Sequence, residues 1–116
     1  MTSIGVYIPT SGRVGNQITL DHLSDKTVEV PTLVCPENEV SRHQEYHSNV
    51  WGCPVHGIGN TRQFILENSL DDVVIMIDDD HLRLTKRVGR SLDYRTHEDY
   101  DSLFDVILSC IDQGFI

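Results

Sequence analysis

The sequence lacks the features that would place it in a membrane, secreted or disulfide-rich class. No apolar run approaches the roughly 18 residues that a membrane-spanning helix needs, and the first four residues contain no basic residue of a secretory signal. The three cysteines are an odd number, without a Cys-x-x-Cys pair or the spacing of a disulfide framework. We therefore expect a cytoplasmic protein with reduced thiols and no membrane partner.

Basic residues are also scarce. The 116 residues include 9 Lys and Arg against 18 Asp and Glu, which gives a net charge of −9. A general nucleic-acid-binding protein normally has a basic footprint, so the composition argues against that class. Five of the nine basic residues nevertheless fall between positions 83 and 95: Arg83, Lys86, Arg87, Arg90 and Arg95. This segment could be a solvated loop or a local positive surface that receives phosphate groups.

Repeats, low-complexity tracts and linkers are absent, so we expect a single domain over residues 1–116. The apolar pattern predicts strands alternating with helices. Strands are expected at 4–8, 28–34, 49–53 and 73–77, and helices at 16–23, from Pro36 onward, from Gly57 to about Asn68, and from the cap residue Thr96 to a stop at Gly114. This order predicts an α/β fold with a mainly parallel sheet, helices on both faces and right-handed crossovers.

Three local patterns refine this expectation. Five consecutive apolar residues at 73–77 are typical of a strand buried on both faces at the centre of a parallel sheet. Pro31 inside the second strand favours an irregular or less central position. In the last helix, the spacing i, i+3, i+4, i+7 makes one apolar stripe of Tyr100, Leu103, Phe104, Ile107, Leu108 and Ile111.

Three adjacent carboxylates, Asp78, Asp79 and Asp80, follow the most apolar strand directly. Ligands of parallel sheets bind outside the carboxyl ends of the strands, so this loop is a candidate site. Two like charges about 4 Å apart cost on the order of 4 kcal/mol at an effective dielectric near 20, unless a cation offsets the repulsion. Alternation along an extended chain would turn Asp78 and Asp80 to one side, where they suit Mg²⁺ or Mn²⁺ together with diphosphate oxygens.

Other interpretations of this acidic run remain open. The three aspartates could form a polar strand end that caps the next segment or pairs with Arg83 and Arg87. His81 follows directly and could be a metal ligand or a hydrogen-bonding neighbour of the carboxylates.

Two further loops contain residues suited to a nucleotide. After the first strand, Pro9, Thr10, Ser11 and Arg13 combine hydroxyl groups for a nucleoside with a guanidinium for phosphate, although such a loop can also be a simple turn. The segment 57–60 lacks the third glycine and the Lys-Ser/Thr that dinucleotide and phosphate-loop motifs require, so we exclude both motifs. Arg62, one turn into the next helix, could face the same sheet edge or be a surface arginine.

Taken together, these segments resemble a known family. Pro-Thr-Ser-Gly-Arg at 9–13, Cys-Pro-Glu at 35–37, Gly-Ile-Gly-Asn-Thr-Arg-Gln at 57–63 and Ile-Asp-Asp-Asp at 77–80 are similar to the N-terminal portion of GT-A fold glycosyltransferases, especially small phage and bacterial enzymes. The resemblance covers residues 4 to about 113. It implies a Rossmann-like nucleotide-diphospho-sugar transferase fold with a DXD-type motif, a nucleotide-sugar-binding domain, and host cytoplasm as the location if the protein is phage-encoded.

The resemblance also implies roles for individual residues. Asp80 would be the main ligand of Mn²⁺ or Mg²⁺, Asp78 would support it directly or through water, and Asp79 would contact ribose or a group beside the metal. The metal would stabilise the departing nucleoside diphosphate while an acceptor hydroxyl attacks the anomeric carbon.

For the donor nucleotide, the resemblance implies that Pro9, Thr10, Ser11 and Arg13 bind the nucleoside and its phosphates. Glu37 would read the base, and Arg62 would lie near the base and diphosphate. A UDP-sugar is the donor that the resemblance favours. The acceptor is not readable; a modified DNA base is one candidate, with the basic stretch 83–95 against the DNA backbone, but the net charge of −9 opposes it.

Family members usually continue beyond the point where this sequence stops, so we expect a truncated form of the fold. No catalytic base can be named, because Glu98, Asp99 and Asp101 are better explained as caps of the last helix. A truncated sheet would leave an unpaired edge and favour a homo-oligomer. Three functions therefore stay open: a complete or partial glycosyltransferase, a catalytically silent nucleotide-binding module, and a divalent-metal phosphohydrolase or nuclease.

Overall fold

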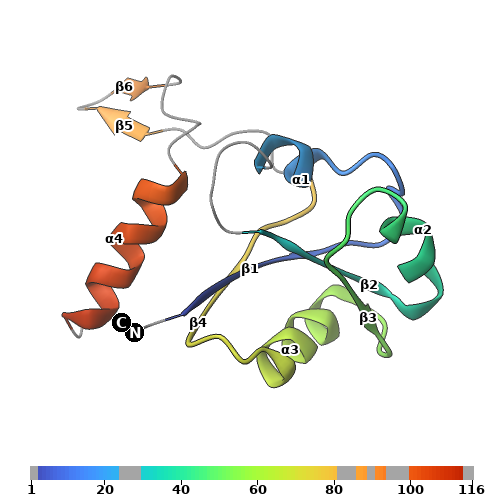
Figure 1. Cartoon of the computed structure of the whole chain (residues 1–116). Helices are drawn as coiled ribbons and strands as arrows, with labels where there is room; N and C mark the ends of the chain where they lie inside the picture. The colour runs from blue at the N-terminus through green and yellow to red at the C-terminus, as the bar shows by residue number, and fades with distance from the viewer. Residues whose placement is uncertain (1–2, 24–29, 81–85, 89–90, 94–99, 114–116) are drawn as a thin grey trace.

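The computed structural model describes residues 3–23, 30–80, 86–88, 91–93 and 100–113. At its centre is a four-stranded, all-parallel sheet in the order β3-β2-β1-β4 (Figure 1). Its strands are β1 (Ile4–Pro9), β2 (Thr32–Pro36), β3 (Val50–Cys53) and β4 (Val73–Met76). The predicted α/β class with a parallel sheet is confirmed.

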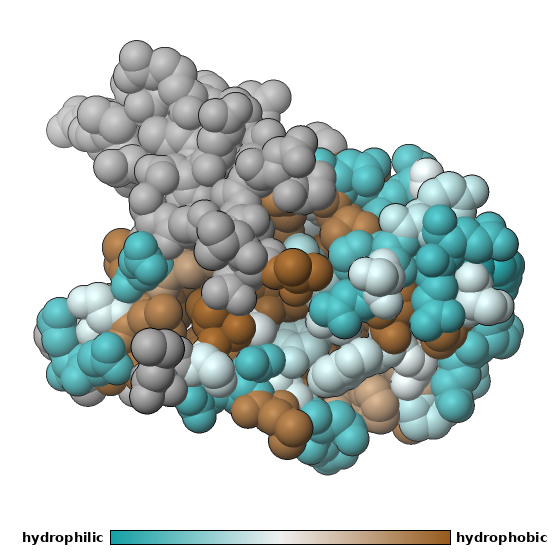
Figure 2. All heavy atoms as spheres, in the orientation of Figure 1, coloured by the Kyte–Doolittle hydropathy of each residue, from teal (hydrophilic) through white to brown (hydrophobic). Residues whose placement is uncertain are grey.

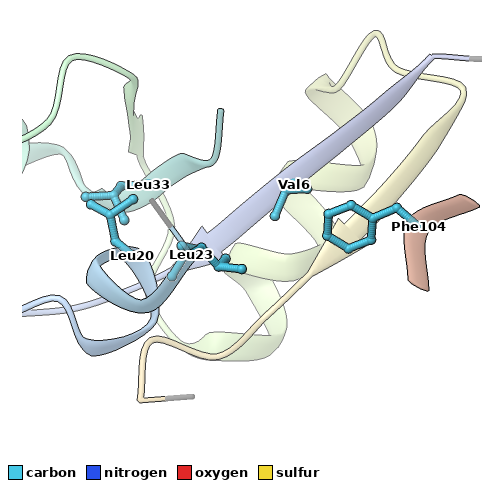
Figure 3. Packing of buried hydrophobic residues seen from close by; sticks show 6 residues of the cluster. Val6, Leu20, Leu23, Leu33 and Phe104 are labelled. Atoms are coloured by element: carbon cyan, nitrogen blue, oxygen red, sulfur yellow. The ribbon is translucent and has the colours of Figure 1, made fainter. Parts of the chain in front are cut away.

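Helices cover both faces of this sheet, as predicted (Figure 1). They are α1 (Ile18–Leu23), α2 (Val40–Gln44) after the 3₁₀ turn η1 (Glu37–Glu39), α3 (Ile58–Asn68) and α4 (Tyr100–Asp112). On one face, strand residues Val6, Ile8 and Leu33 pack with Leu20 and Leu23 of α1 and Phe104 of α4 (Figure 3). On the other face, Tyr7, Val34 and Cys53 pack with Ile65 of α3.

The strand order explains why α3 lies on its own face. The chain moves outward from β1 to β2 and β3, and then returns past β1 to reach β4. Connections of one hand that run in opposite directions must pass over opposite faces of the sheet. The order therefore reverses between β1 and β4, and the loops that follow these two strands open a crevice at the carboxyl edge of the sheet.

The prediction that the strand at 73–77 packs on both of its faces is confirmed, but its predicted place at the centre of the sheet is wrong. Among the described strands, β4 pairs only with β1, and all four of its residues are half-buried. The sheet centre is β1 and β2, whose residues from Val6 to Pro9 and from Thr32 to Cys35 are buried. The unbroken apolar run has another cause: Ile75 packs into the core of the α1 and α4 face, whereas Val74 and Met76 pack into the core of the α3 face.

Most other element predictions are confirmed with shifted ends. The second strand begins at Thr32, after Pro31, whose carbonyl oxygen accepts a hydrogen bond from His47 Nε2 at 2.7 Å. The less central position expected from Pro31 is wrong, because the proline lies outside the strand and β2 pairs with both β1 and β3. The first helix begins at Ile18 rather than at residue 16, and Pro36 is the N-cap of η1. The strand at Val50–Cys53 and the helix at Ile58–Asn68 lie where they were expected.

The last helix is also confirmed over Tyr100–Asp112, with Phe104 only 3% exposed. Its predicted caps Thr96, Asp99 and Gly114 lie outside the described residues, as does His81. In the stretch 83–95, the expected loop is replaced in part by an antiparallel pair of strands, β5 (Lys86–Val88) and β6 (Ser91–Asp93). Gly89-Arg90 between them is a two-residue spacing typical of hairpins.

Exposed apolar side chains are present on several elements. They include Leu70, which is 98% exposed, and Val106 of α4, which is 59% exposed. On the face shown in Figure 2, apolar residues gather beside α4 and β4, and hydrophilic residues cover the side of α2 and β3. Among the described helices, none is long and apolar enough to cross a membrane.

Candidate functional site

A cavity of about 530 Å³ lies at the carboxyl edge of the sheet. Its volume is within the range of small-molecule sites. The loops that follow all four parallel strands contribute to its lining: Pro9, Thr10, Ser11 and Arg13 after β1, Pro36 at the end of β2, Val55, His56, Gly57 and Ile58 after β3, and Asp78, Asp79 and Asp80 after β4. The structure therefore brings together seven of the nine predicted site residues at the predicted edge.

Asp79 connects the β1 and β4 loops. Its Oδ2 accepts a hydrogen bond from Thr10 Oγ1 at 2.8 Å and lies 3.4 Å from Arg13 Nε. The Asp79 side chain is 21% exposed, so these contacts are partly shielded from water. Oδ2 of Asp79 is thus engaged by two groups of the protein.

Gln17 holds the loop after β1 from beneath. Its Nε2 donates to Thr10 Oγ1 at 2.9 Å and to the carbonyl oxygen of Arg13 at 3.2 Å. Gln17 is 5% exposed and Thr10 is 7% exposed. A buried side chain thus fixes both ends of the segment that contacts Asp79, a role that the sequence pattern did not reveal.

The same loop has a left-handed backbone that requires support. Gly12 and Arg13 have φ of 75° and 52°, and a non-glycine residue at positive φ is disfavoured. The Gly12 amide donates to Glu39 Oε1 at 2.7 Å, which ties the loop to η1. Arg13 is thereby held in the conformation that brings its guanidinium to Asp79.

Asp78 and Asp80 have exposed side chains at the same cavity. The expected alternation does not orient them, because β4 ends at Met76 and the chain turns at residues 79–80, so all three aspartates line the cavity. Asp78 Oδ1 accepts from Arg62 Nη2 at 3.0 Å, an exposed ion pair. The backbone is fixed by Thr19, whose hydroxyl donates to the Asp78 carbonyl and whose amide donates to the Asp79 carbonyl at 3.1 Å.

These carboxylates fit a divalent cation that also binds substrate oxygens. Mg²⁺ is usually held by one or two carboxylates together with phosphate oxygens and water. Asp78 and Asp80 present such oxygens to an open cavity, whereas Asp79 is bound to Thr10 and Arg13. Within the described part of the chain, no three His, Cys, Asp or Glu side chains form a ready-made metal cage.

Two predicted residues lie beside the cavity rather than in its lining. Arg62 reaches it only through its ion pair with Asp78. Glu37 packs against Gly52 of β3, where an added Cβ would lie 3.2 Å from Glu37 Cγ. The neighbouring Glu39, which the sequence analysis did not single out, contacts the β1 loop instead. Because Glu37 and Glu39 are only two positions apart, the sequence did not indicate which of them would lie at the site.

The cavity also contains His56, Thr61 and Gly57, to which the sequence pattern assigned no role. Gly57 is the N-cap of α3 and has φ of 94°, which turns the chain from the cavity wall into the helix. The available signal was the segment 57–63, which contributes to the family resemblance, although only Arg62 in it was assigned a role. Side chains of the candidate bases Glu98, Asp99 and Asp101 lie outside the described residues.

Comparison with known proteins gives one match. A family model described as TET-Associated Glycosyltransferase matches residues 4–114, nearly the whole chain. No curated protein and no solved structure matches the sequence significantly.

Proposed function

Because the chain belongs to the TET-associated glycosyltransferase family, we propose that it transfers a sugar from a nucleotide-diphosphate donor bound at the carboxyl edge of the sheet. One observation carries this proposal. Three carboxylates, a buried threonine and an arginine line a single cavity of about 530 Å³. Hydroxyl, guanidinium and carboxylate groups at the ends of β1 and β4 match the parts of a nucleotide diphosphate and its cation.

The exposed carboxylates of Asp80 and Asp78 would hold Mn²⁺ or Mg²⁺, with Asp80 as the main ligand. The cation supplies positive charge that stabilises the departing nucleoside diphosphate. A cation bound to Asp78 would compete with Arg62 for the same carboxylate, because Arg62 Nη2 lies 3.0 Å from Asp78 Oδ1. Arg62 released from this pair, together with Arg13, can then meet the diphosphate oxygens, because guanidinium groups bind phosphate in a bidentate manner.

The nucleoside would lie towards the ends of β1, β2 and β3. The cavity wall there is apolar at Pro9, Pro36 and Val55, and Thr10 and Ser11 add hydroxyl groups beside it. Asp79, held by Thr10 and Arg13, would face the ribose or the phosphates from the β4 side. Glu37 and Arg62 lie just outside the lining, so their predicted contacts require a donor that reaches past the cavity rim.

The acceptor is an unidentified hydroxyl group. A hydroxyl-bearing modified DNA base is the candidate to test first, with the basic stretch at 83–95 as the surface for the DNA backbone. A catalytically silent nucleotide-binding module would have the same donor cavity and would differ by the absence of sugar transfer.

The test is calorimetric titration of UDP and UDP-sugars with and without Mn²⁺. We expect binding to wild type that depends on Mn²⁺ and is lost in Asp80→Ala, and binding that persists in Asp105→Ala, which removes an exposed aspartate of α4. Release of UDP in the presence of candidate acceptors then distinguishes an active transferase from a silent module. Absence of binding to UDP and to a panel of other nucleotides would overturn the donor site.

A further inference from the structure

A second cavity, of about 140 Å³, lies between α1, β2 and α2. None of the described residues that line it also lines the larger cavity. Leu20 and Leu33 supply apolar walls, and the polar lining includes Gln17, Asp21 and His43. Gly15, Tyr46 and His47 complete the described lining.

Two residues of this cavity have polar atoms without a partner. Gln17 Oε1 and His43 Nδ1 are the buried side-chain atoms that make no hydrogen bond among the described residues. Gln17 is 5% exposed and His43 is 0% exposed. The opposite end of each side chain is engaged: Gln17 Nε2 donates to Thr10, and His43 Nε2 lies 3.3 Å from Glu39 Oε1. Buried polar atoms are rarely left unpaired, so both atoms call for a ligand.

The chemistry of these atoms defines what the ligand must offer. A carboxylate only accepts hydrogen bonds, so His43 Nε2 is the donor to Glu39, and in the neutral tautomer that makes this bond Nδ1 keeps a lone pair. His47 donates from Nε2 to the Pro31 carbonyl, and in the corresponding neutral tautomer its Nδ1 is an acceptor as well. Gln17 Oε1 is an acceptor too, and Asp21 adds a negative charge. No lysine or arginine is among the described residues of the lining.

We propose that this cavity is a second binding site, separate from the donor site, for a small ligand with a primary ammonium group. Three N–H donors on one positive centre match Gln17 Oε1, His43 Nδ1 and the carboxylate of Asp21. Tyr46 places an aromatic side chain in the lining, and aromatic rings attract cations. Since Gln17 and Glu39 also hold the loop at residues 10–13, the ligand would act on the side chains that position Thr10 and Arg13.

The test is a titration with methylammonium chloride at constant ionic strength and without nucleotide. NMR of the histidine ring nitrogens monitors each step of the titration. We expect a saturable shift at His43 Nδ1 that neither sodium nor tetramethylammonium produces, because neither has N–H donors. His56, which lines the other cavity, is the internal control and should not shift.

Two variants locate the binding. Asp21→Asn and Tyr46→Leu should each weaken methylammonium binding severalfold, whereas Asp105→Asn on α4 should leave it unchanged. A response without saturation, an equal response to tetramethylammonium, or full affinity in both variants would overturn the proposal and leave ordered water as the occupant. Because no nucleotide is present, this result is independent of donor binding.

Discussion

At the scale of single residues, the candidate site depends on contacts made beneath the cavity as much as on the groups that line it. Glu39 is the clearest example, because its carboxylate accepts the amide of Gly12 at 2.7 Å and is close to His43. Its side chain is 13% exposed, and its contact with the fully buried His43 is the one that water replaces poorly. Glu39 therefore supports a loop whose residues Gly12 and Arg13 both have positive φ.

Two substitutions of Glu39 distinguish the effect of its hydrogen bond on stability from the effect of its charge. Glu39→Ala leaves the Gly12 amide and the buried His43 Nε2 without their acceptor and should lower the free energy of unfolding by about 1–3 kcal/mol, the range for a buried polar group left unpaired. Glu39→Gln keeps an acceptor oxygen and should lose less. Urea denaturation measures both, with the exposed Glu45→Ala as a control expected to change stability by less than about 0.5 kcal/mol. Equal effects of the three substitutions would contradict this role.

Cys35 gives a second test at the residue scale. Burial, followed by the charge of nearby Glu39, raises the pKa of the Cys35 thiol to about 11. At pH 8 only about one molecule in a thousand then carries the thiolate, the reactive form. We expect alkylation of native Cys35 by iodoacetamide, measured by mass spectrometry, to be slow at pH 8 and to keep accelerating up to about pH 11. In urea-unfolded protein the alkylation rate should stop rising at a pH near the pKa of an ordinary thiol.

The same pKa makes stability depend on alkaline pH. The pKa of Cys35 is higher in the folded state, so the stabilisation that it contributes is complete below about pH 9 and is lost as the pH rises towards about 11. Burial also raises the pKa of Tyr7, which acts in the same direction above pH 10. The difference between wild type and Cys35→Ser in urea denaturation isolates the cysteine. A difference that does not change between pH 8 and pH 11 would contradict the assignment.

At the scale of elements, the segments that local pattern specifies well are those with one dominant contact surface. Residues of β1 and β2 pack into both cores, so their apolar runs identify them as strands but do not give their places in the sheet. The stripe of α4 follows from periodicity alone. The position of β4 does not, because its apolar residues pack alternately into both cores and mimic those of a central strand. The hairpin of β5 and β6 was missed because its strands have three residues each, too few for a period-2 pattern.

The start of α3 allows a matched pair of substitutions. Gly57 has φ of 94° and no other atom closer than 4.0 Å to an added Cβ, so Gly57→Ala should destabilise through backbone strain alone, by about 1–3 kcal/mol. Gly59 lies inside the helix with open space around it, and Gly59→Ala should stabilise by about 0.5–1 kcal/mol. Urea denaturation of both proteins gives the signs; destabilisation by Gly59→Ala would show that the helix start tolerates no side chain.

At the scale of the whole molecule, the location of the site could be predicted from the sequence, but the hydrogen bonds and ion pairs within it could not. Loops after parallel strands meet at one edge in any fold of this class, so Thr10, Arg13 and the three aspartates were expected together. Which side chain holds which depends on contacts such as Thr10 to Asp79, 69 positions apart in sequence. Neither periodicity nor motif spacing encodes such a pair, and the roles of Gln17 and Glu39 were missed for the same reason.

The acidic cluster also links ligand binding to the stability of the whole fold. Asp78 and Asp80 repel each other and Asp79 without a cation, so Asp80→Ala should leave the melting temperature of the ligand-free protein unchanged or higher. A ligand at 100 times its Kd adds about 2.7 kcal/mol to the free energy of unfolding, which corresponds to roughly 10 °C for a domain of this size. We therefore expect UDP with Mn²⁺ to raise the melting temperature of wild type and not that of Asp80→Ala, as measured by differential scanning calorimetry. Asp105→Ala should respond like wild type. A lower ligand-free melting temperature in Asp80→Ala would instead show that Asp80 stabilises the fold in the absence of a cation.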